Sequence, residues 1–352
     1  MSSAIVLAKT GEGTFLASRL ANEGHVTRVF VENGEPSYVG YSNPSRMVKL
    51  KDLPYDILVA GDGSLEVPTD QPVIGSNEFT LRFYNVEQYH NDVLQYLMDQ
   101  DSLHPEDSSL DQFTLVTLWY SQGELVPVSF LHLVYSRMLE GGRGCQIPAF
   151  GQGVATKLWP AERLLVPLMP RLNELMHKVQ YTGPVVIRFH VDEDIVYYHG
   201  IDFRMYAALH TGVFELVKLP LFDFLWRLSI GEQDIPVRED YALSLRLSTP
   251  PFPYGLDYPV DGYQVINFEH QAMNHVYLDG LRQERGAVLL AGNSGRIGWV
   301  TARGESVQEA RRRLFRTVKN ARPIPEVQYR RDVGNEMEEL INLLDVGGWQ
   351  DA

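Results

Sequence analysis

The sequence contains a single cysteine, Cys145, among 352 residues. An intramolecular disulfide and a zinc site built from several cysteines are therefore excluded, and a reducing compartment is expected. No uninterrupted apolar run approaches the ~20 residues that a membrane-spanning helix needs. Residues 1–5 lack the basic region of a signal peptide. These absences predict a cytoplasmic protein without a membrane partner.

Basic residues are also scarce, since 31 Lys and Arg stand against 45 Asp and Glu for a net charge of −14. This balance opposes wholesale wrapping by nucleic acid. Residues 303–331 are the exception, with nine basic and three acidic residues, a net charge of +6 that leaves −20 on the rest of the chain. The segment suits an anionic substrate or a nucleic-acid backbone, or it is a solvated helix face.

Hydrophobic periodicity divides the chain into three regions and a linker. Strand-like residues 5–8 and 26–31 flank a glycine turn and a helical pattern, which predicts a βαβ unit and a doubly wound lobe over residues 1–98. Polar residues 99–112 predict a linker. Residues 113–235 predict a central mixed sheet with one long helix over 160–178, and residues 236–352 a small α+β lobe. The expected fold class is α/β combined with α+β.

Two glycine-containing turns are candidate anion sites. Gly11 and Gly13 follow the first strand, where backbone N–H groups at a helix start bind phosphate. The third glycine of the dinucleotide fingerprint is missing, so a plain tight turn is the alternative. Gly142, Arg143 and Gly144 form a second loop, whose guanidinium suits a carboxylate or a phosphate. A simple connection is the alternative there.

Residues 183–191 and 195–202 predict a β-hairpin with one polar face. Strand alternation places Arg188, Tyr198 and Asp202 on that face, and Arg204 follows directly. The face is either a ligand floor or a solvated surface.

Metal and thiol chemistry are not predicted. His190 and the acidic residues 192–194 permit a metal interpretation, but three acids at a turn favour a solvated loop. Cys145 has no His or Asn partner at a spacing typical of nucleophilic catalysis.

The C-terminal region resembles a known family. Residues 295–302 (GRIGWVTA), the helical pattern over 306–318 and residues 328–334 (QYRRDVG) closely resemble the end of phosphoribosylamine–glycine ligase, also called glycinamide ribonucleotide synthetase. The first strand, its glycine loop and residues 72–76 (PVIGS) are similar as well, and residues 115–225 follow the family's order weakly. The resemblance implies an ATP-grasp-like architecture.

The chain departs from that family where ATP and metal bind. Only 15 residues, 98–112, stand in place of the lid lobe, too few for two strands and a helix. The family's metal-binding strand reads Glu-x-Asn-x-Arg, whereas this chain has Gly200, Asp202 and Arg204, so one carboxylate is gone. Arg188 falls where the family has a small residue and can occupy the vacated metal space. A degenerate ATP-grasp-like fold with no certain cofactor and no metal is expected.

A ligase uses ATP to activate a carboxylate, so a chain without the lid needs an acceptor that is already activated. The hypothesis is transfer of glycine, or a similar amino acid, onto a phosphorylated nucleotide-type acceptor. A pyrophosphorylated base in phage DNA, modified in the host cytoplasm, is one such acceptor. The alternatives are a conventional ligase that uses MgATP and a non-catalytic scaffold that keeps the fold. The oligomeric state stays open.

In this hypothesis Arg204 binds the amino-acid carboxylate and Asp202 takes the proton of the amine. The other expected substrate-binding residues are Gly11, Gly13, Gly142, Arg143, Gly144, Arg188, Tyr198, Arg296, Arg330 and Arg331, of which Arg143, Arg296, Arg330 and Arg331 engage phosphate.

Overall fold

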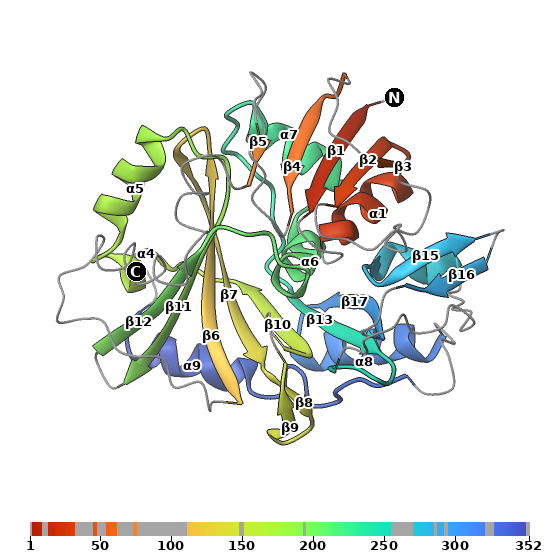
Figure 1. Ribbon diagram of the computed structural model, residues 1–352. Helices are drawn as coiled ribbons and strands as arrows, with labels where there is room; N and C mark the ends of the chain where they lie inside the picture. The colour runs from red at the N-terminus through yellow and green to blue at the C-terminus, as the bar shows by residue number, and fades with distance from the viewer. Residues whose placement is uncertain are drawn as a thin grey trace.

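The computed structural model describes residues 2–8, 13–31, 45–47, 54–61, 73–75, 111–147, 151–192, 195–254, 270–284, 287–291, 295–320 and 327–349. Gly11 and most of the expected linker lie outside these residues. The described part is built around two large sheets (Figure 1).

The N-terminal sheet is parallel and has the strand order β3-β2-β1-β4-β5. Its strands are β1 (Ser3–Ala8), β2 (Val26–Val31), β3 (Ser45–Met47), β4 (Ile57–Ala60) and β5 (Val73–Ile74). Helix α1 (Thr14–Asn22) links β1 to β2, which gives the predicted βαβ unit. β1 and β4 are continuous apolar runs, as expected for parallel strands covered on both faces.

The second sheet has eight strands in the order β12-β11-β6-β7-β10-β13-β17-β14. The strands are β6 (Gln112–Ser121), β7 (Glu124–Tyr135), β10 (Gly153–Leu158), β11 (Gly183–Asp192), β12 (Ile195–Asp202), β13 (Tyr241–Ser248), β14 (Val276–Leu278) and β17 (Arg296–Gly304). Short hairpins β8 (Arg137–Leu139) with β9 (Arg143–Gln146), and β15 (Leu281–Glu284) with β16 (Ala287–Leu290), lie outside it.

Every described pairing in this second sheet is antiparallel, so the expectation of a mixed sheet is wrong. The reason is visible at the first hairpin, where Gln122 and Gly123 have φ of 48° and 85° and join β6 directly to β7. Two residues with positive φ form the tight turn that antiparallel strands require. The sheet takes strands from both sides of residue 235.

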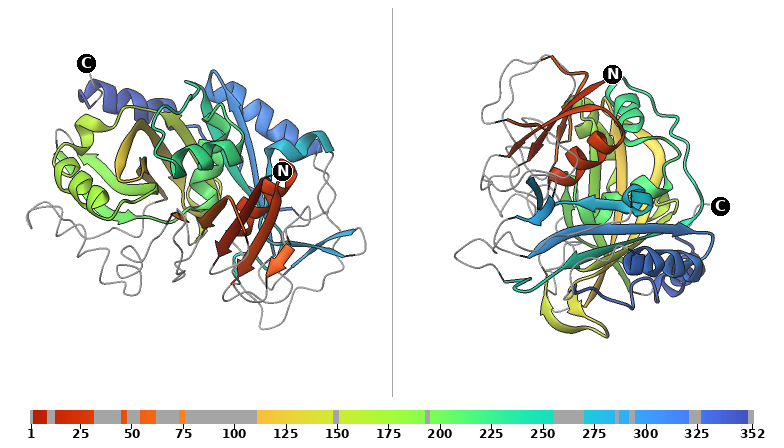
Figure 2. Two further views of the ribbon diagram at one scale, coloured as in Figure 1. Left: turned by 90° about the horizontal axis from the view of Figure 1, so that it is seen from above. Right: turned by 90° about the vertical axis from the view of Figure 1, so that its right-hand side faces the viewer.

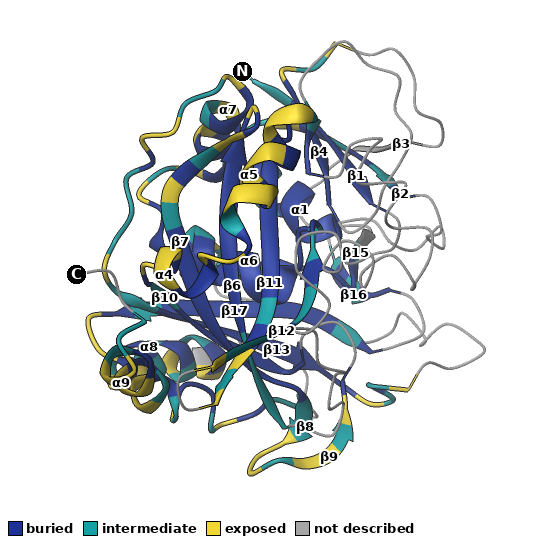
Figure 3. Cartoon of the chain, turned by 90° about the vertical axis from the view of Figure 1, so that its left-hand side faces the viewer, coloured by how far each residue is buried: buried dark blue, intermediate teal, exposed yellow. Residues whose placement is uncertain are grey.

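Helices cover both faces of the large sheet. α6 (Ala207–Leu216) packs on one face of β13 and β17, and α8 (Val307–Asn320) packs on the opposite face of the same strands. α4 (Glu162–Leu165), α5 (Met169–Lys178) and α9 (Met337–Val346) share the face of α8, with exposed outer surfaces (Figure 3). α7 (Leu221–Ser229) shares the face of α6.

The single helix expected over residues 160–178 is two helices, α4 and α5. The chain leaves the helical hydrogen-bond pattern at residues 166–168. Pro167 lies in this break and accounts for it, because proline lacks an N–H donor and its ring clashes with the preceding turn. The expected start of α8 is confirmed, since the N–H of Glu309 donates to Ser306 Oγ at 3.2 Å.

The N-terminal sheet is fixed to the large sheet through α1 (Figure 2). Thr14 Oγ1 donates to the carbonyl of Asp279 at 3.1 Å, and Arg19 Nη1 donates to the carbonyl of Asn274 at 2.6 Å. Glu23, just past α1, accepts the backbone N–H of Leu221 at 3.0 Å at the start of α7. Among the described helices, none is both long and apolar enough to cross a membrane.

Candidate functional site

A line of polar residues follows the β11–β12 hairpin on the face opposite to α4 and α5. We call it the polar strip. It comprises the polar residues Arg188, His190, His199, Asp202 and Arg204, together with Gly200, which lies among them. Ile187, Phe189 and Ile201 alternate with it and enter the apolar core on the other side. The alternation that places Arg188 and Asp202 on one face is therefore present.

A β-bulge changes the composition of the strip. Arg188 pairs with Gly200, but its neighbour Phe189 pairs with Tyr198, so His199 is an extra residue. Tyr198 is 1% exposed, and its hydroxyl donates to the carbonyl of Leu164 at 2.5 Å in the core. The prediction that Tyr198 shares a face with Asp202 is wrong, because simple alternation does not foresee a bulge.

His199 is the strip residue that sequence reasoning missed. The only signal for it was Gly200, because a glycine inside a strand pattern often marks a bulge. The extra residue brings His199 beside His190 on the neighbouring strand.

The Asp202 carboxylate is held by the residues that follow it. Arg204 Nη2 and the hydroxyl of Tyr206 each donate to Asp202 Oδ2 at 2.6 Å, and the backbone N–H of Arg204 donates to Oδ1 at 2.9 Å. The Arg204 guanidinium also lies 4.7 Å from the centre of the Tyr206 ring. One edge of this guanidinium thus binds Asp202, and a third of the side chain remains exposed.

The same segment reaches the N-terminal sheet. The N–H of Met205 donates to the carbonyl of Gly61 at 3.2 Å, directly after β4. A Cβ at Gly61 would lie 3.1 Å from the Cα of Gly13, the residue that precedes α1. These contacts place one end of the strip at the carboxyl ends of β1 and β4, the edge at which doubly wound sheets bind ligands.

Arg296 lies near this junction as well. It begins β17, and its neighbour Ile297 accepts the N–H of Asp279 at 3.4 Å. Asp279 in turn accepts Thr14 at the first turn of α1. The structure therefore brings Gly13, Arg296 and the end of the strip into one region through Asp279 and Gly61.

The second predicted glycine loop is the tight turn between β8 and β9. Gly141 and Gly142 have φ of 64° and 70°, which other residues rarely adopt. The N–H of Gly141 donates to Asp332 Oδ2 at 2.9 Å, and a Cβ at Gly142 would lie 3.0 Å from Asp111 Oδ2. Two protein carboxylates therefore lie against this turn. Arg143 and Gly144 follow on β9, exposed.

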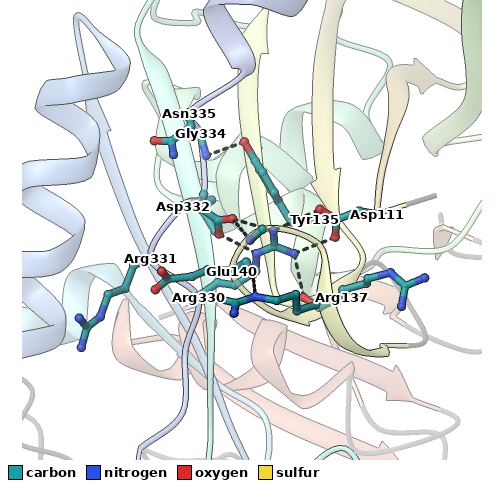
Figure 4. Close-up of polar contacts among 12 residues, drawn as sticks. Asp111, Tyr135, Arg137, Glu140, Arg330, Arg331, Asp332, Gly334 and Asn335 are labelled. Atoms are coloured by element: carbon teal, nitrogen blue, oxygen red, sulfur yellow. Dashed lines mark hydrogen bonds and ion pairs between the residues drawn. The ribbon is translucent and has the colours of Figure 1, made fainter. Parts of the chain in front are cut away.

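Arg330 joins those two carboxylates (Figure 4). Its side chain is wholly buried, with Nε and Nη2 donating to the two oxygens of Asp332 at 2.7 and 2.8 Å. Nη1 donates to Asp111 Oδ1 at 3.1 Å and to the carbonyl of Arg137 at 2.9 Å. These contacts favour a structural role for Arg330 in anchoring the β8–β9 hairpin, whereas its neighbour Arg331 is exposed.

The same contacts favour the ionised form of the Asp332 carboxyl. Burial by itself would raise the pKa of this carboxyl, but the hydrogen bonds from Arg330 and from the N–H of Gly141 outweigh it and lower the pKa. Asp111, the other partner, lies two residues before Phe113, and the Arg188 guanidinium lies 4.1 Å from the centre of the Phe113 ring. The start of β6 thus connects the β8–β9 hairpin to the polar strip.

Beneath the strip, α6 carries a neutral histidine. His210 is buried and its Nδ1 donates to the carbonyl of Tyr206 at 2.9 Å. Burial lowers the pKa of His210 to about 4, so this contact fixes the tautomer at neutral pH. His210 supports the turn that holds Tyr206 against Asp202.

The basic residues of segment 303–331 differ in their surroundings, because some are paired or buried and others are exposed. Arg303 pairs with Asp240 at 3.0 Å and Arg313 with Glu309 at 2.7 Å, and Arg330 is buried. Arg312 is 79% exposed, and Arg316 and Lys319 are exposed one and two turns further along α8. These three lie on the helix that covers the face of the sheet opposite to α6. The exposed cations and the junction with the N-terminal sheet therefore lie on different faces.

The strip does not fit Mg²⁺. Mg²⁺ prefers several carboxylate oxygens, with phosphates completing its shell. Gly200 supplies no ligand and pairs with Arg188, and Asp202 is already bound to Arg204 and Tyr206. Across the ranges that the structure describes, no three His, Cys, Asp or Glu residues gather in a way that could hold a metal.

Comparisons with known proteins show where this architecture recurs. No family model matches the sequence, and no curated protein does. Among solved structures, phosphoribosylamine–glycine ligase of Thermotoga maritima aligns over 94% of this chain and 100% of its own, at a TM-score of 0.59 and 15% identity. The chain has an ATP-grasp-like fold.

Two further structures share it. Phosphoribosylglycinamide synthetase of Anaerococcus prevotii aligns over 92% of this chain and 99% of its own, with a TM-score of 0.54 and 9% identity. Pyruvate carboxylase of Rhizobium etli aligns over 94% of this chain and 33% of its own, with a TM-score of 0.55 and 14% identity. At these identities the similarity concerns the fold alone.

Proposed function

We propose that this chain is an ATP-grasp-like transferase that joins glycine, or a similar amino acid, to an acceptor that is already activated and phosphorylated. The observation that carries the proposal is the polar strip. Arg188 stands opposite Gly200, where the resembling family has a metal-binding carboxylate, and Arg204 binds Asp202. The strip thus offers cations to anionic substrates in place of ligands for a metal–ATP complex.

The proposed step needs no ATP, because the leaving group is already on the acceptor. The nitrogen of the amino acid attacks the acceptor carbon that bears a pyrophosphate ester. A C–N bond forms, the C–O bond breaks, and pyrophosphate leaves with the electron pair. Asp202 accepts the proton that the amine releases, while Arg204 binds the amino-acid carboxylate.

Phosphate groups would lie at the two ends of the strip. Gly13 and Arg296 lie toward α1, where a helix start favours an anion. Arg143 and Arg331, near Gly142 and Gly144 of the β8–β9 hairpin, are exposed at the other end. Arg330 would act through the hairpin that it anchors, and Tyr198 through the packing of β12.

A pyrophosphorylated base in phage DNA is the acceptor that combines these features. Arg312, Arg316 and Lys319 on α8 face away from the strip, so they would contact the duplex only where it continues from the strip to the face of α8. Phosphate contacts of this kind supply affinity without reading sequence.

A conventional MgATP-dependent ligase is the second candidate. It is favoured by the similarity in fold to a phosphoribosylamine–glycine ligase and a phosphoribosylglycinamide synthetase along nearly their whole length. Under that alternative the metal would need carboxylates other than those of the strip.

The experiment is a transfer assay with labelled glycine and a DNA oligonucleotide that carries a pyrophosphorylated hydroxymethyl base, with EDTA and without ATP. We expect glycine incorporation and pyrophosphate release in equal amounts. Asp202→Asn should lower the rate at least ~100-fold, the lower range for losing a general base. Arg204→Lys should weaken glycine binding and lower the rate at limiting glycine, because lysine does not bind a carboxylate with two parallel hydrogen bonds as arginine does. Asp223→Asn and Arg163→Lys, exposed on α7 and α4, are the matched controls.

Transfer that appears only with MgATP would show that the chain is an ATP-dependent ligase. Full activity of Asp202→Asn and Arg204→Lys would remove those two residues from the mechanism. Absence of transfer under both conditions, from protein that unfolds cooperatively, would favour the scaffold.

A further inference from the structure

Two half-buried aromatic rings meet where α8 contacts residues 327–331. The ring centroids of Phe315 and Tyr329 are 6.3 Å apart, at an interplanar angle of 36°. Both rings pack partly on the core, and neither is fully covered. The Arg311 guanidinium lies 5.9 Å from the centre of the Phe315 ring, and the Arg331 guanidinium lies 5.8 Å from the centre of the Tyr329 ring. Each ring therefore has a guanidinium beside it.

The two guanidiniums differ in role. Arg311 Nη2 donates to the carbonyl of Arg331 at 2.9 Å, so the segment that carries Tyr329 is held along α8. Arg331 is exposed and points away from Arg330 (Figure 4). Asp332, the next residue in the chain, binds Arg330 through both carboxylate oxygens. Arg311 is thus structural, whereas Arg331 faces solvent beside a held ring.

A row of exposed cations lies beside the rings on α8. Arg312, Arg316 and Lys319 are spaced at i, i+4 and i+7, so they share one side of the helix. Arg312 is 79% exposed, and Phe315 is its i+3 neighbour on the helix. A rise of 1.5 Å per residue spreads the three cations over about 10 Å along the axis. Such a row suits a chain of anions more than a single anion.

Acidic residues lie near the start of α8 and not around the rings. Those exposed or half-buried near the starts of α8 and α9 are Glu305, Glu309, Glu338 and Glu339. The start of α9 lies at the same end of α8, because a Cβ at Gly334 would lie 3.0 Å from Val307. Residues 314–319 and 327–331 contain no acidic residue. Residues 321–326, outside the described ranges, add one arginine and one glutamate and hence no net charge.

The combination of rings and cations favours one kind of partner. Unpaired bases stack on aromatic side chains, while cations follow the phosphates of the same strand. A duplex keeps the faces of its bases stacked inside and would meet only the cations. A lipid surface would need apolar groups that enter the acyl region, whereas these rings are held against the core.

We propose that this part of the protein is a binding surface for single-stranded DNA, in which bases stack on the two rings and the cations bind phosphates. The α8 surface, as we call it, comprises Phe315, Tyr329, Arg312, Arg316, Lys319 and Arg331. The choice of DNA rests on the proposed function, and the inference adds that the DNA reaching α8 is unpaired. An enzyme reaches the reacting atom of a base only after that base has left the stack of the duplex.

The test measures binding of fluorescein-labelled oligothymidylate, about 12 nucleotides long, to the full chain by fluorescence anisotropy at several salt concentrations. We expect binding that weakens as salt rises. An abasic strand of the same length keeps the phosphates and should bind at least ~5-fold more weakly, the lower range for losing one stacked base. The duplex form of the strand should also bind more weakly than the single strand.

Two sets of variants separate stacking from charge. Phe315→Leu with Tyr329→Leu keeps apolar packing on the core but removes the rings, so binding should fall at least ~5-fold with an unchanged dependence on salt. The triple variant Arg312→Gln, Arg316→Gln and Lys319→Gln removes up to three phosphate contacts. The slope of log K against log salt concentration should then shrink by about 2, at ~0.7 per contact with a single strand.

Lys178→Gln is the matched control for charge. Lys178 is exposed on α5, which packs near β7, whereas α8 packs on β13 and β17 (Figure 1). This variant should bind the strand as the wild type does, with the same dependence on salt. Thermal unfolding of each variant checks that it is folded.

No binding of the single strand by the wild type would overturn the α8 surface. Equal binding of the abasic strand, tighter binding of the duplex, or full binding by the folded double leucine variant would overturn it as well. Displacement of the strand by phosphatidylserine vesicles would reject DNA in favour of a membrane.

The proposed function is tested separately by glycine transfer. Single-stranded DNA that binds through the rings, without any transfer, would leave the α8 surface standing and reject the transferase. Transfer to a single-stranded acceptor at an unchanged rate in the double leucine variant, at limiting acceptor, would do the reverse.

Discussion

Two adjacent arginines differ completely in environment. Arg330 is buried between Asp111 and Asp332, while Arg331 is exposed and lies 5.8 Å from the centre of the Tyr329 ring. In the sequence they are the same residue type in one short motif. Their difference depends on Asp111, 219 residues earlier in the chain, which no local pattern reveals.

Replacing Arg330 should therefore destabilise the protein far more than replacing Arg331. Arg330→Met leaves two carboxylates without their partner, which costs about 3–5 kcal/mol for a buried ion pair. Arg331→Met, on the surface, should change the free energy of unfolding by less than about 0.5 kcal/mol. Urea unfolding followed by fluorescence measures the free energy of unfolding of both variants. Equal effects would show that the ion pairs of Arg330 with Asp111 and Asp332 do not stabilise the fold.

At the scale of elements, hydrogen bonds to the buried carboxylate of Glu215 join α6 to β17 and to the residue that precedes β14. Glu215 on α6 accepts His275 Nδ1 at 2.9 Å and Thr301 Oγ1 at 2.5 Å. Burial would raise the pKa of Glu215, but hydrogen bonds from His275 and Thr301 and the charge of Arg19 lower it. The hydrogen bond to Glu215 raises the pKa of His275, although burial opposes it. The two groups thus form an ion pair when His275 is protonated.

This network predicts a stability that falls as the pH rises. The contribution of His275 is complete below its unfolded pKa of about 6.5 and is lost as the pH passes through the raised pKa of the folded protein. Nearly half of the His275 side chain is exposed, so we expect less than about 1 kcal/mol. Chemical unfolding at pH 6.5 and pH 9 measures the loss.

His275→Gln is the control, because glutamine keeps a donor for Glu215 and does not titrate. The variant should lose less stability over the same interval than the wild type. Buried His132 and His210 do not interfere, since burial lowers the pKa of both and they are neutral above pH 6.5. An identical pH dependence in the two proteins would contradict the prediction.

At the scale of the whole molecule, local patterns predict elements better than their assembly. The βαβ opening, the β11–β12 hairpin and the start of α8 follow from apolar periodicity and capping residues. The continuity of the eight-stranded sheet from β12 to β14 depends on pairings between distant segments, such as β10 with β13. Periodicity within one strand carries no information on its partner.

In the candidate site too, local patterns predict some residues and miss others. Arg188, Asp202 and Arg204 follow from alternation along one hairpin, and the structure places them on one strip. His199 and the inward turn of Tyr198 depend on a single-residue bulge, and the burial of Arg330 depends on a contact across the chain. Tertiary contacts therefore decide which of the polar residues meet solvent.

We propose that the polar strip replaces a metal–nucleotide site with cations, so that the chain acts without ATP. The most direct measurement is calorimetric titration of the purified protein with MgATP, with glycine as a parallel titrant. We predict a binding signal for glycine and none for MgATP. Stoichiometric MgATP binding with a micromolar dissociation constant would contradict this proposal and favour the ATP-dependent ligase.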